Sequence, residues 1–357
     1  MHTQTEQPSP TNDPALPSTA TPPNVSPSTL HRIFFGAEGL RAGWSVLIFA
    51  ALFAAFLFTV RTIGQIVHPP THHASPSDTF SLGHMLINES VPLLGVLLIT
   101  WIMSKIERRP QAIYGLGGAR KLSRFFAGLA WGVTCLTLLI LVLWKTGFLV
   151  FDGRLVFGSD VLRYGAGWLL GFLIVALLEE CFTRGYLQYT LTRGLAGLYQ
   201  SIFKTRHNAA LGFWTSALIL SVLFGAVHSS NPGESPIGLL TASLASMVFC
   251  LSLWRTGSLW WAIGFHTSWD WAQSFLYGVA DSGIMAQHHL LATHPAGKLL
   301  LSGGDTGPEG SIFVLAILTL ITLIILFTLP RTNQGPLISA FDTIKPHRSL
   351  ISNLPAR

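Results

Sequence analysis

The sequence predicts an all-α, polytopic membrane protein. Half of its 357 residues are hydrophobic and only 11% are charged, whereas soluble globular proteins carry about 25% charged residues. Several apolar stretches are about 20 residues long, the length of a helix that spans a bilayer core. No run of alternating apolar and polar residues competes as a strand. Composition therefore predicts a protein whose solvent is largely the membrane.

Three regions of different composition follow one another along the chain. The first 30 residues hold seven prolines and few large apolar side chains, so they cannot bury enough surface to offset the entropy of ordering. We predict a disordered Pro/Ser/Thr-rich cytoplasmic tail at 1–42, an eight-helix membrane domain at 43–330 and a cytoplasmic C-terminal tail at 331–357. The N-terminus lacks the basic-then-apolar start of a signal peptide.

Eight candidate transmembrane helices are predicted in the membrane domain. They cover 43–60, 82–104, 125–144, 161–192, 207–228, 235–254, 257–279 and 311–330. The second contains Glu89, which we expect near its outer end. Most of the others are uninterrupted, but the fourth contains two adjacent glutamates and the seventh contains an aspartate.

The placement of Lys and Arg predicts the orientation. Cytoplasmic loops carry an excess of these residues, and here every second connection is basic: Arg32 and Arg41; Lys105, Arg108, Arg109, Arg120, Lys121 and Arg124; Arg193, Lys204 and Arg206; Arg255; Arg331, Lys345, Arg348 and Arg357. Eight helices with both termini in the cytoplasm satisfy this alternation. The net charge of +6 therefore has a membrane explanation, and without a basic patch on a soluble face we expect no nucleic-acid partner.

Three cysteines, Cys135, Cys181 and Cys250, fall inside apolar segments. Their number is odd, and no CxxC spacing is present. We expect reduced, buried thiols that pack as small hydrophobic side chains.

Ionisable residues within the helices are the strongest functional signal. Each costs about 2.5–3.5 kcal/mol in a membrane helix and usually faces a protein interior or a water-filled cavity. The candidates are Glu179, Glu180 and Arg184 on the fourth helix, His228 on the fifth, and His266 with Asp270 on the seventh.

Helical spacing sorts these residues. Glu180 and Arg184 are four apart, which allows an ion pair on one face, and His266 and Asp270 have the same spacing. Glu179 then lacks a partner in its own helix, so it must be protonated, hydrated or paired with another helix. Each group also has a structural reading, as an ion pair, a helix cap or an interhelical hydrogen bond. The presence of several buried ionisable groups together favours a functional site over a purely structural role.

The residues resemble a known family. "EECFTR" (179–184) matches Glu-Glu-x-x-x-Arg, "FGAVH" (224–228) matches Phe-x-x-x-His, and "HTSWD" (266–270) matches His-x-x-x-Asn/Asp, preceded by "RTGSLWWAIG". In this order they resemble the CPBP family of intramembrane proteases, also called Abi or CAAX-protease-like. That family includes the eukaryotic Ras-converting CAAX prenyl endopeptidase and bacterial bacteriocin-immunity proteins. The resemblance covers about 160–280, and Asp270 stands where many relatives have Asn.

The resemblance implies an endopeptidase that hydrolyses peptide bonds of membrane-associated peptides or proteins. By motif position, Glu179 would be the general base that holds a water with His228, and Glu180 with Arg184 would position it. His266, oriented by Asp270, would stabilise the oxyanion or donate a proton. It also implies a multi-pass protein of a bacterial-type plasma membrane, in contact with the lipid bilayer.

Metal dependence is open at this point. The family is commonly called a metalloprotease, and Glu179, His228 and His266 could supply the His₂Glu set of a catalytic zinc. A zinc bound by all three would leave only Glu180 as base, and Glu180 is committed to Arg184. A metal-free water activated by glutamate explains the residues about as well.

Two other classes of protein compete with the protease. One is a catalytically inactive membrane scaffold or an immunity-type protein, although all three motifs are intact. The other is a transporter with a proton-relay carboxylate, for which internal repeats are expected and no convincing repeat relates the two halves.

Overall fold

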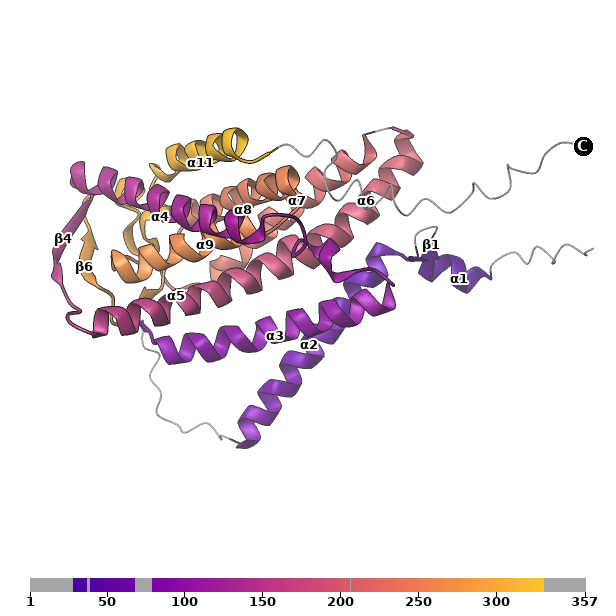
Figure 1. Cartoon of the computed structure of the whole chain (residues 1–357), viewed down its shortest axis with the longest axis horizontal. Helices are drawn as coiled ribbons and strands as arrows, with labels where there is room; N and C mark the ends of the chain where they lie inside the picture. Colours follow the sequence, from indigo (N-terminus) through magenta and orange to yellow (C-terminus); the bar gives the residue numbers. More distant parts are fainter. Residues whose placement is uncertain (1–27, 37–38, 68–78, 206, 331–357) are drawn as a thin grey trace, which may run out of the picture.

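The computed structural model describes residues 28–36, 39–67, 79–205 and 207–330, and its framework is a bundle of long helices (Figure 1). The prediction of an all-α polytopic membrane protein is confirmed. Within the described residues, six helices are long and apolar enough to cross a membrane: α2 (Ala42–Val67), α3 (Leu82–Ile106), α4 (Lys121–Lys145), the continuous helix Asp160–Phe203, α7 (Asn208–Val227, followed by the 3₁₀ turn His228–Ser230) and α8 (Pro236–Thr256).

The last two predicted spans are shorter than expected. Helix α9 (Trp260–Trp271) has 12 residues and continues as the 5-residue π-helical turn η4 (Ala272–Leu276), and α11 (Val314–Thr328) has 15. The predicted ends at 257–259, 277–279 and 311–313 instead belong to connections, in which Gly257 and Gly278 have positive φ. Length and composition thus identify six spans and a shorter apolar helix, not the eight predicted.

The fourth predicted span is much longer than 161–192. Helix α5 (Asp160–Glu179), the π-helical segment η2 (Glu180–Leu187) and α6 (Gln188–Phe203) form one 44-residue helix. At about 1.5 Å per residue it greatly exceeds a bilayer core of about 30 Å. Arg193, predicted in a loop, lies within this helix and is buried, donating hydrogen bonds to the Leu40 carbonyl and Ser45 Oγ.

Short elements close the ends of the bundle. They comprise α1 (Thr29–Phe34), the β1–β2 hairpin (Phe35–Gly36, Gly39–Leu40), the parallel pair β3 (Thr79–Phe80) and β5 (Met285–Ala286), the antiparallel pair β4 (Leu149–Arg154) and β6 (Leu291–Pro295), α10 (Leu299–Ser302), and the 3₁₀ turns Gln111–Tyr114, Gly304–Thr306 and Pro308–Gly310. Figure 1 shows β4 and β6 at the end of the bundle opposite α6 and α1. Most of the predicted tail 1–42 and all of 331–357 lie outside the described residues. Within 1–42, α1 and the hairpin are ordered elements.

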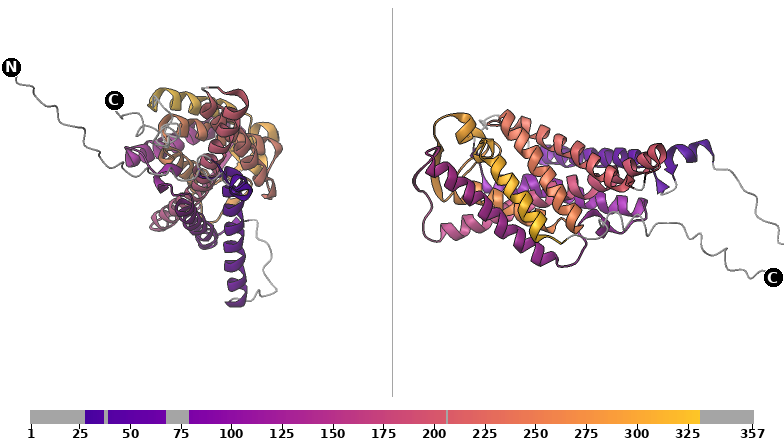
Figure 2. Two further views of the ribbon diagram at one scale, coloured as in Figure 1. Left: turned by 90° about the vertical axis from the view of Figure 1, so that its right-hand side faces the viewer. Right: turned by 90° about the horizontal axis from the view of Figure 1, so that it is seen from above.

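Helix α2 is the outlying member of the bundle. Figure 2 shows it extending away from the other helices, and only Ser45 and Phe49 of its side chains are buried. One core cluster, which includes Cys135, Trp261 and Phe265, joins α4 to α9, and a second joins α2, α3 and α5 to α6–α9. The two helices that carry most of the candidate site, α5 and α9, are therefore held inside the bundle.

Glycines allow α4 and α9 to approach closely. A Cβ at Gly128 would collide with the Trp261 carbonyl, one at Gly132 with Ser268, and one at Gly264 on α9 with the Phe125 carbonyl. Gly128 and Gly132 have the four-residue spacing by which small residues bring membrane helices together. This packing fixes α9, and with it His266 and Asp270, against the rest of the bundle.

Gly128→Ala is expected to destabilise the protein because the new methyl group forces α4 and α9 apart. Overpacking of this kind costs about 1–3 kcal/mol. Thermal unfolding of the purified chain in detergent measures it. Gly197→Ala on α6 is the matched control, since a Cβ there meets nothing within 4 Å and Ala is favoured over Gly within a helix. Equal melting temperatures for the two variants would contradict this packing.

Candidate active site

The two adjacent glutamates occupy different environments. Glu179 is the last residue of α5 and Glu180 the first of the π-helical segment η2. Neighbouring helical residues point about 100° apart, so one apolar helix can bury one carboxylate and present the other. The Glu180 side chain is 0% exposed and the Glu179 side chain is 28% exposed. Glu179 is therefore the accessible carboxylate of the pair.

Glu180 is sealed in an ion pair. Arg184 Nη1 lies 2.7 Å from Glu180 Oε1, as the spacing of four predicted. The guanidinium lies over the Phe224 ring at 4.4 Å and the Phe249 ring at 5.5 Å from their centroids. Among the described residues, Glu180 Oε2 and Arg184 Nε and Nη2 have no hydrogen-bond partner. The pair is thus buried against aromatic rings, and several of its polar atoms have no other partner.

Arg184→Met is expected to destabilise the protein by about 3–5 kcal/mol, because it leaves the buried Glu180 carboxylate with only the His266 ring, which it shares with Asp270, as a partner. Thermal or denaturant unfolding in detergent measures the effect. The double variant Glu180→Gln/Arg184→Met removes both charges and is expected to recover most of the loss. If the double variant is as unstable as the single one, lost packing rather than an unpaired charge is responsible.

His228 presents one ring nitrogen to the site. Its Nδ1 lies 2.7 Å from the carbonyl oxygen of Phe224. A carbonyl can only accept, so Nδ1 carries the proton and Nε2 of the neutral ring is left as an acceptor. The Phe224 ring packs against His228 at 4.9 Å between centroids as well as against Arg184. Phe224, to which sequence analysis gave no role, therefore connects the motifs of α5 and α7.

His266 lies among three carboxylates. Its Nδ1 is 3.3 Å from Glu180 Oε1, and its Nε2 is 3.3 Å from Asp270 Oδ2 and 3.7 Å from Glu179 Oε2. An ionised carboxylate can only accept hydrogen bonds, so the arrangement suits an imidazolium that donates from both nitrogens. The structure thus brings His266 and Asp270 together as predicted, and adds a contact with Glu180 that spacing alone did not indicate.

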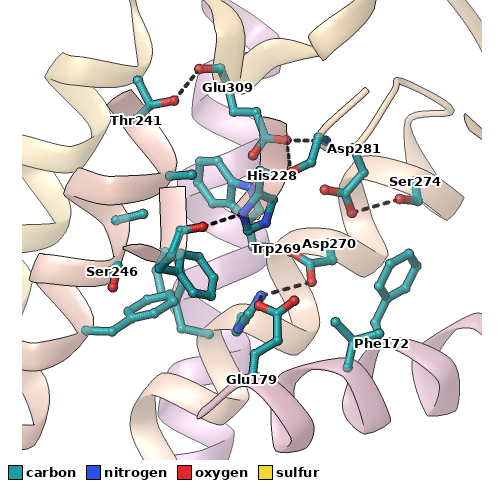
Figure 3. A pocket seen from close by; sticks show the side chains of 18 of the residues that line it. Phe172, Glu179, His228, Thr241, Ser246, Trp269, Asp270, Ser274, Asp281 and Glu309 are labelled. Carbon is teal, nitrogen blue, oxygen red and sulfur yellow. Dashed lines mark hydrogen bonds and ion pairs between the residues drawn. The ribbon is translucent and has the colours of Figure 1, made fainter. Parts of the chain in front are cut away.

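Glu179, His228, His266 and Asp270 all line one cavity of about 380 Å³, whereas Glu180 and Arg184 lie behind its wall. Figure 3 shows the labelled polar groups converging from several helices. Aromatic residues Trp168, Phe172, Phe224, Phe249, Phe265 and Trp269 form much of the remaining wall. This combination, an apolar chamber with a few convergent polar groups, is typical of a site for a ligand or substrate.

Sequence reasoning missed the far end of the cavity. Asp281, Ser282 and Glu309, from the connection between η4 and α11, line it together with Asn231 and Glu89. Burial, and then the nearby charges of Asp270 and Glu309, raise the pKa of Asp281 well above its ordinary value. The available signal was that the connection 277–313 holds three acidic residues and one lysine. The sequence alone does not indicate that two of these carboxylates, Asp281 and Glu309, line the cavity.

The described residues contain no group of three or more His, Cys, Asp or Glu side chains arranged to hold a metal ion. His266 directs its nitrogens at carboxylates, and His228 Nδ1 is used by the backbone of its own helix. As arranged here, Glu179, His228 and His266 do not fit the zinc set considered from the sequence. The zinc ligand set stays a prediction.

The cysteines lie outside this chemistry. Cys135, Cys181 and Cys250 are free thiols and all are buried, which confirms the expectation from the sequence. Cys181 follows Glu180 directly but does not line the cavity.

A second polar cluster anchors the π-helical segment. Glu107, at the end of α3, accepts hydrogen bonds from Tyr186 at 3.1 Å and from Tyr114 at 3.4 Å. Arg109 and Arg193 each lie 3.8 Å from the same carboxylate. Burial, and then the Glu107 charge, raise the pKa of Tyr114. Since Tyr186 lies within η2, Glu107 ties the segment that carries Glu180 and Arg184 to the end of α3.

The fold defines a multi-pass membrane protein with a polar cavity between its helices. Residues 162–272 match the family model described as type II CAAX prenyl endopeptidase Rce1-like. These residues carry all three motifs, and the match supports the resemblance of this part of the chain to the CPBP, or CAAX-protease-like, family. No curated protein and no solved structure matched the chain in the same comparisons.

Proposed function

We propose that the protein is an intramembrane endopeptidase that hydrolyses peptide bonds of membrane-associated substrates with a water activated by Glu179 and His228. One observation supports the proposal most strongly. Of the two adjacent glutamates, Glu180 forms a buried ion pair with Arg184, whereas Glu179 faces the cavity. The site retains one carboxylate free to accept a proton. A purely structural role would not require such a separation.

The water is held by two acceptors. The Glu179 carboxylate and the unprotonated Nε2 of His228 each accept one of its hydrogens, which leaves an oxygen lone pair free to attack a carbonyl carbon. As the C–O bond forms, Glu179 takes the proton as general base. Positioned proton transfer of this kind contributes about 10²–10⁴-fold to a rate.

The remaining charges suit the tetrahedral intermediate. The oxyanion forms beside the His266 imidazolium, which Glu180 and Asp270 hold in orientation. Preorganised donors stabilise such an oxyanion without reorganisation. The C–N bond then breaks, and Glu179 returns its proton to the leaving amine. The products are a carboxylic acid and an amine, and the carboxylate of Glu179 is regenerated.

Cleavage is expected to survive removal of divalent metal, because the proposed water is activated by side chains alone. Activity of the purified chain after dialysis against a chelator, together with its zinc content by mass spectrometry, tests this. Loss of cleavage that added zinc restores would overturn the metal-free route and support the ligand set Glu179, His228 and His266.

The topology belongs to the same proposal. We place α9 with η4, and α11, as short additional spans, giving eight crossings with both termini in the cytoplasm of a bacterial-type cell. The alternation of basic connections supports this orientation. Labelling of single cysteines introduced at Asp305 and at Lys204 with a membrane-impermeant reagent in intact cells tests it. Only the first is expected to react, and reaction of Lys204→Cys would invert the topology.

The decisive experiment compares cells that express the wild-type chain with cells that express Glu179→Gln at equal levels. N- and C-terminal peptides of membrane proteins are quantified in both. Termini that disappear in the variant support the protease and identify its substrates. Identical profiles under growth and stress conditions would contradict it and favour the non-catalytic scaffold.

A further inference from the structure

We propose that Glu107, the residue that follows α3, is a positioning residue for the hydrolytic site. Through Tyr186 it fixes the π-helical segment η2, and thereby the directions of the two adjacent glutamates. This inference rests on the proposed endopeptidase function and adds a residue that the three sequence motifs do not contain. Glu107 does not line the cavity, so it acts on the reaction only through η2.

The helix that carries the two glutamates changes its geometry at the site. It is α-helical up to Glu179, π-helical over Glu180–Leu187 and α-helical again from Gln188. A π-helical turn closes between residues five apart instead of four, and such turns are rare and often found at functional sites. The extra residue rotates everything that follows by about 100° relative to an uninterrupted α-helix. Contacts at the far end of η2 therefore help to set the directions of the glutamates at its start.

The Glu107 carboxylate divides its contacts between two parts of the chain. Its Oε1 accepts a hydrogen bond from Tyr186 of η2 at 3.1 Å and lies 3.8 Å from Arg193 of α6. Its Oε2 accepts a hydrogen bond from Tyr114 at 3.4 Å and lies 3.8 Å from Arg109, both in the connection that follows α3. One oxygen thus holds the long helix, and the other holds the connection to which Glu107 itself belongs.

Burial strengthens the contact between Glu107 and η2. The Glu107 side chain is 2% exposed and Tyr186 is 0% exposed. The Ser45 carbonyl also lies 3.4 Å from the Tyr186 hydroxyl, but the carboxylate is nearer, and a charged acceptor forms the stronger hydrogen bond. The Tyr186 ring stacks on Phe49 at 4.3 Å between centroids. Removal of the hydroxyl alone therefore breaks the contact with Glu107 and leaves the ring packed.

The connection held by Glu107 also holds the start of α9. The Gly115 carbonyl accepts a hydrogen bond from the Leu259 N–H at 2.9 Å, directly before α9. The Leu116 carbonyl accepts one from Trp260 Nε1 at 3.2 Å, at the first residue of that helix. Since α9 carries the imidazole of the site, Glu107 joins η2 to the same short segment that anchors the other half of the catalytic groups.

A small rotation of η2 would affect the reaction more than substrate binding. Glu179 is the proposed general base, and Glu180 contacts His266 at 3.3 Å. Misplacement of reacting groups by about 1 Å can reduce a rate by about 10²-fold. The apolar wall of the cavity comes mostly from other helices. Loss of the contact with Glu107 is therefore expected to lower kcat with little change in KM.

The test removes two tyrosine hydroxyls separately in the full-length chain in detergent. Substitution of Glu107 itself would leave Arg109 and Arg193 buried without their carboxylate, which is expected to impair folding. Tyr186→Phe and Tyr114→Phe each remove one hydrogen bond to this carboxylate and retain the aromatic ring. Only Tyr186→Phe breaks a contact with η2, so Tyr114→Phe is the matched control.

Cleavage is measured with a quenched fluorescent peptide that carries a cleavage site identified from the terminal peptides of cells. Tyr186→Phe is expected to lower kcat by about 10- to 100-fold with KM nearly unchanged, whereas Tyr114→Phe is expected to retain the kcat of the wild type. Equal losses of kcat in the two variants, or the wild-type kcat in both, would overturn the inference while leaving the endopeptidase intact.

The reactivity of Cys181 reports on η2 independently of cleavage. This buried thiol lies within η2, and the buried thiol of Cys135 on α4 is the internal control. Labelling with N-ethylmaleimide, quantified at each cysteine by mass spectrometry, is expected to be severalfold faster at Cys181 in Tyr186→Phe and unchanged at Cys135. Tyr114→Phe is expected to match the wild type. Equal labelling of Cys181 in all three proteins, or faster labelling of both cysteines, would overturn the inference.

The two measurements separate the two proposals. Faster labelling of Cys181 in Tyr186→Phe, together with no cleavage by the folded wild type, would contradict the endopeptidase and retain Glu107 as the residue that positions η2. Cleavage by the wild type, with kcat and Cys181 labelling unchanged in Tyr186→Phe, would do the reverse.

Discussion

Glu179→Gln is expected to lower kcat/KM for peptide hydrolysis by about 10²–10⁴-fold, the contribution of a positioned general base. An amide retains the size of the side chain but cannot take the proton of the attacking water. The measurement is the cleavage rate of a peptide substrate by the purified variant. Its stability is expected to be unchanged or slightly higher, because the variant removes one of several carboxylates around the cavity.

Glu180→Gln is the matched comparison, since it makes the same chemical change at the next residue. Here the Arg184 guanidinium is left buried without its counter-charge, so the melting temperature is expected to fall together with activity. The assignment of roles depends on this contrast. A stable Glu180→Gln variant beside an unstable Glu179→Gln variant would reverse it.

The class of fold was predictable because the apolar composition of a long segment determines that it forms a membrane helix. Backbone polar groups in a bilayer must be satisfied internally, so long apolar runs such as 125–144 become helices wherever they occur. The ends were less predictable. The helix from Asp160 to Phe203 continues far beyond 192 because Arg193, which resembles a loop residue in the sequence, donates hydrogen bonds to Leu40 of β2 and Ser45 of α2 and lies 3.8 Å from Glu107.

The predicted lengths of the short helices were wrong for a related reason. Residues 257–279 are apolar enough to predict a full span, but Gly257 and Gly278 adopt positive φ and limit the helix. A glycine within an apolar run does not by itself reveal whether it packs, as Gly264 does against α4, or ends a helix. Contacts from other segments decide between the two.

Some contacts of the candidate site were predictable from the sequence, and others were not. Spacing of four along one helix predicted the pairs Glu180–Arg184 and His266–Asp270, and both are present at 2.7 Å and 3.3 Å. The spacing of residues along one helix does not predict contacts between different helices. The approach of His266 to Glu180 and the inward turn of Glu309 both depend on packing between segments distant in sequence.

His266→Gln is expected to reduce kcat by about 10²–10³-fold, the usual loss when one oxyanion donor is removed. The imidazolium is the cationic group of the cavity wall, and Glu179, Glu180 and Asp270 all approach it within 4 Å. Glutamine can donate a hydrogen bond but carries no charge to balance the oxyanion. The effect should therefore fall mainly on kcat, with a small change in KM.

Without the His266 imidazolium, the neighbouring carboxylates repel one another. The single variant His266→Gln is therefore expected to be less stable as well. Asp270→Asn in the same chain separates the two consequences. The double variant His266→Gln/Asp270→Asn removes one of the repelling charges and should recover melting temperature without recovering kcat. Recovery of both would mean that His266 acts only by holding the fold. Recovery of stability alone is the expected result, because the double variant relieves the repulsion between carboxylates but supplies no imidazolium beside the oxyanion.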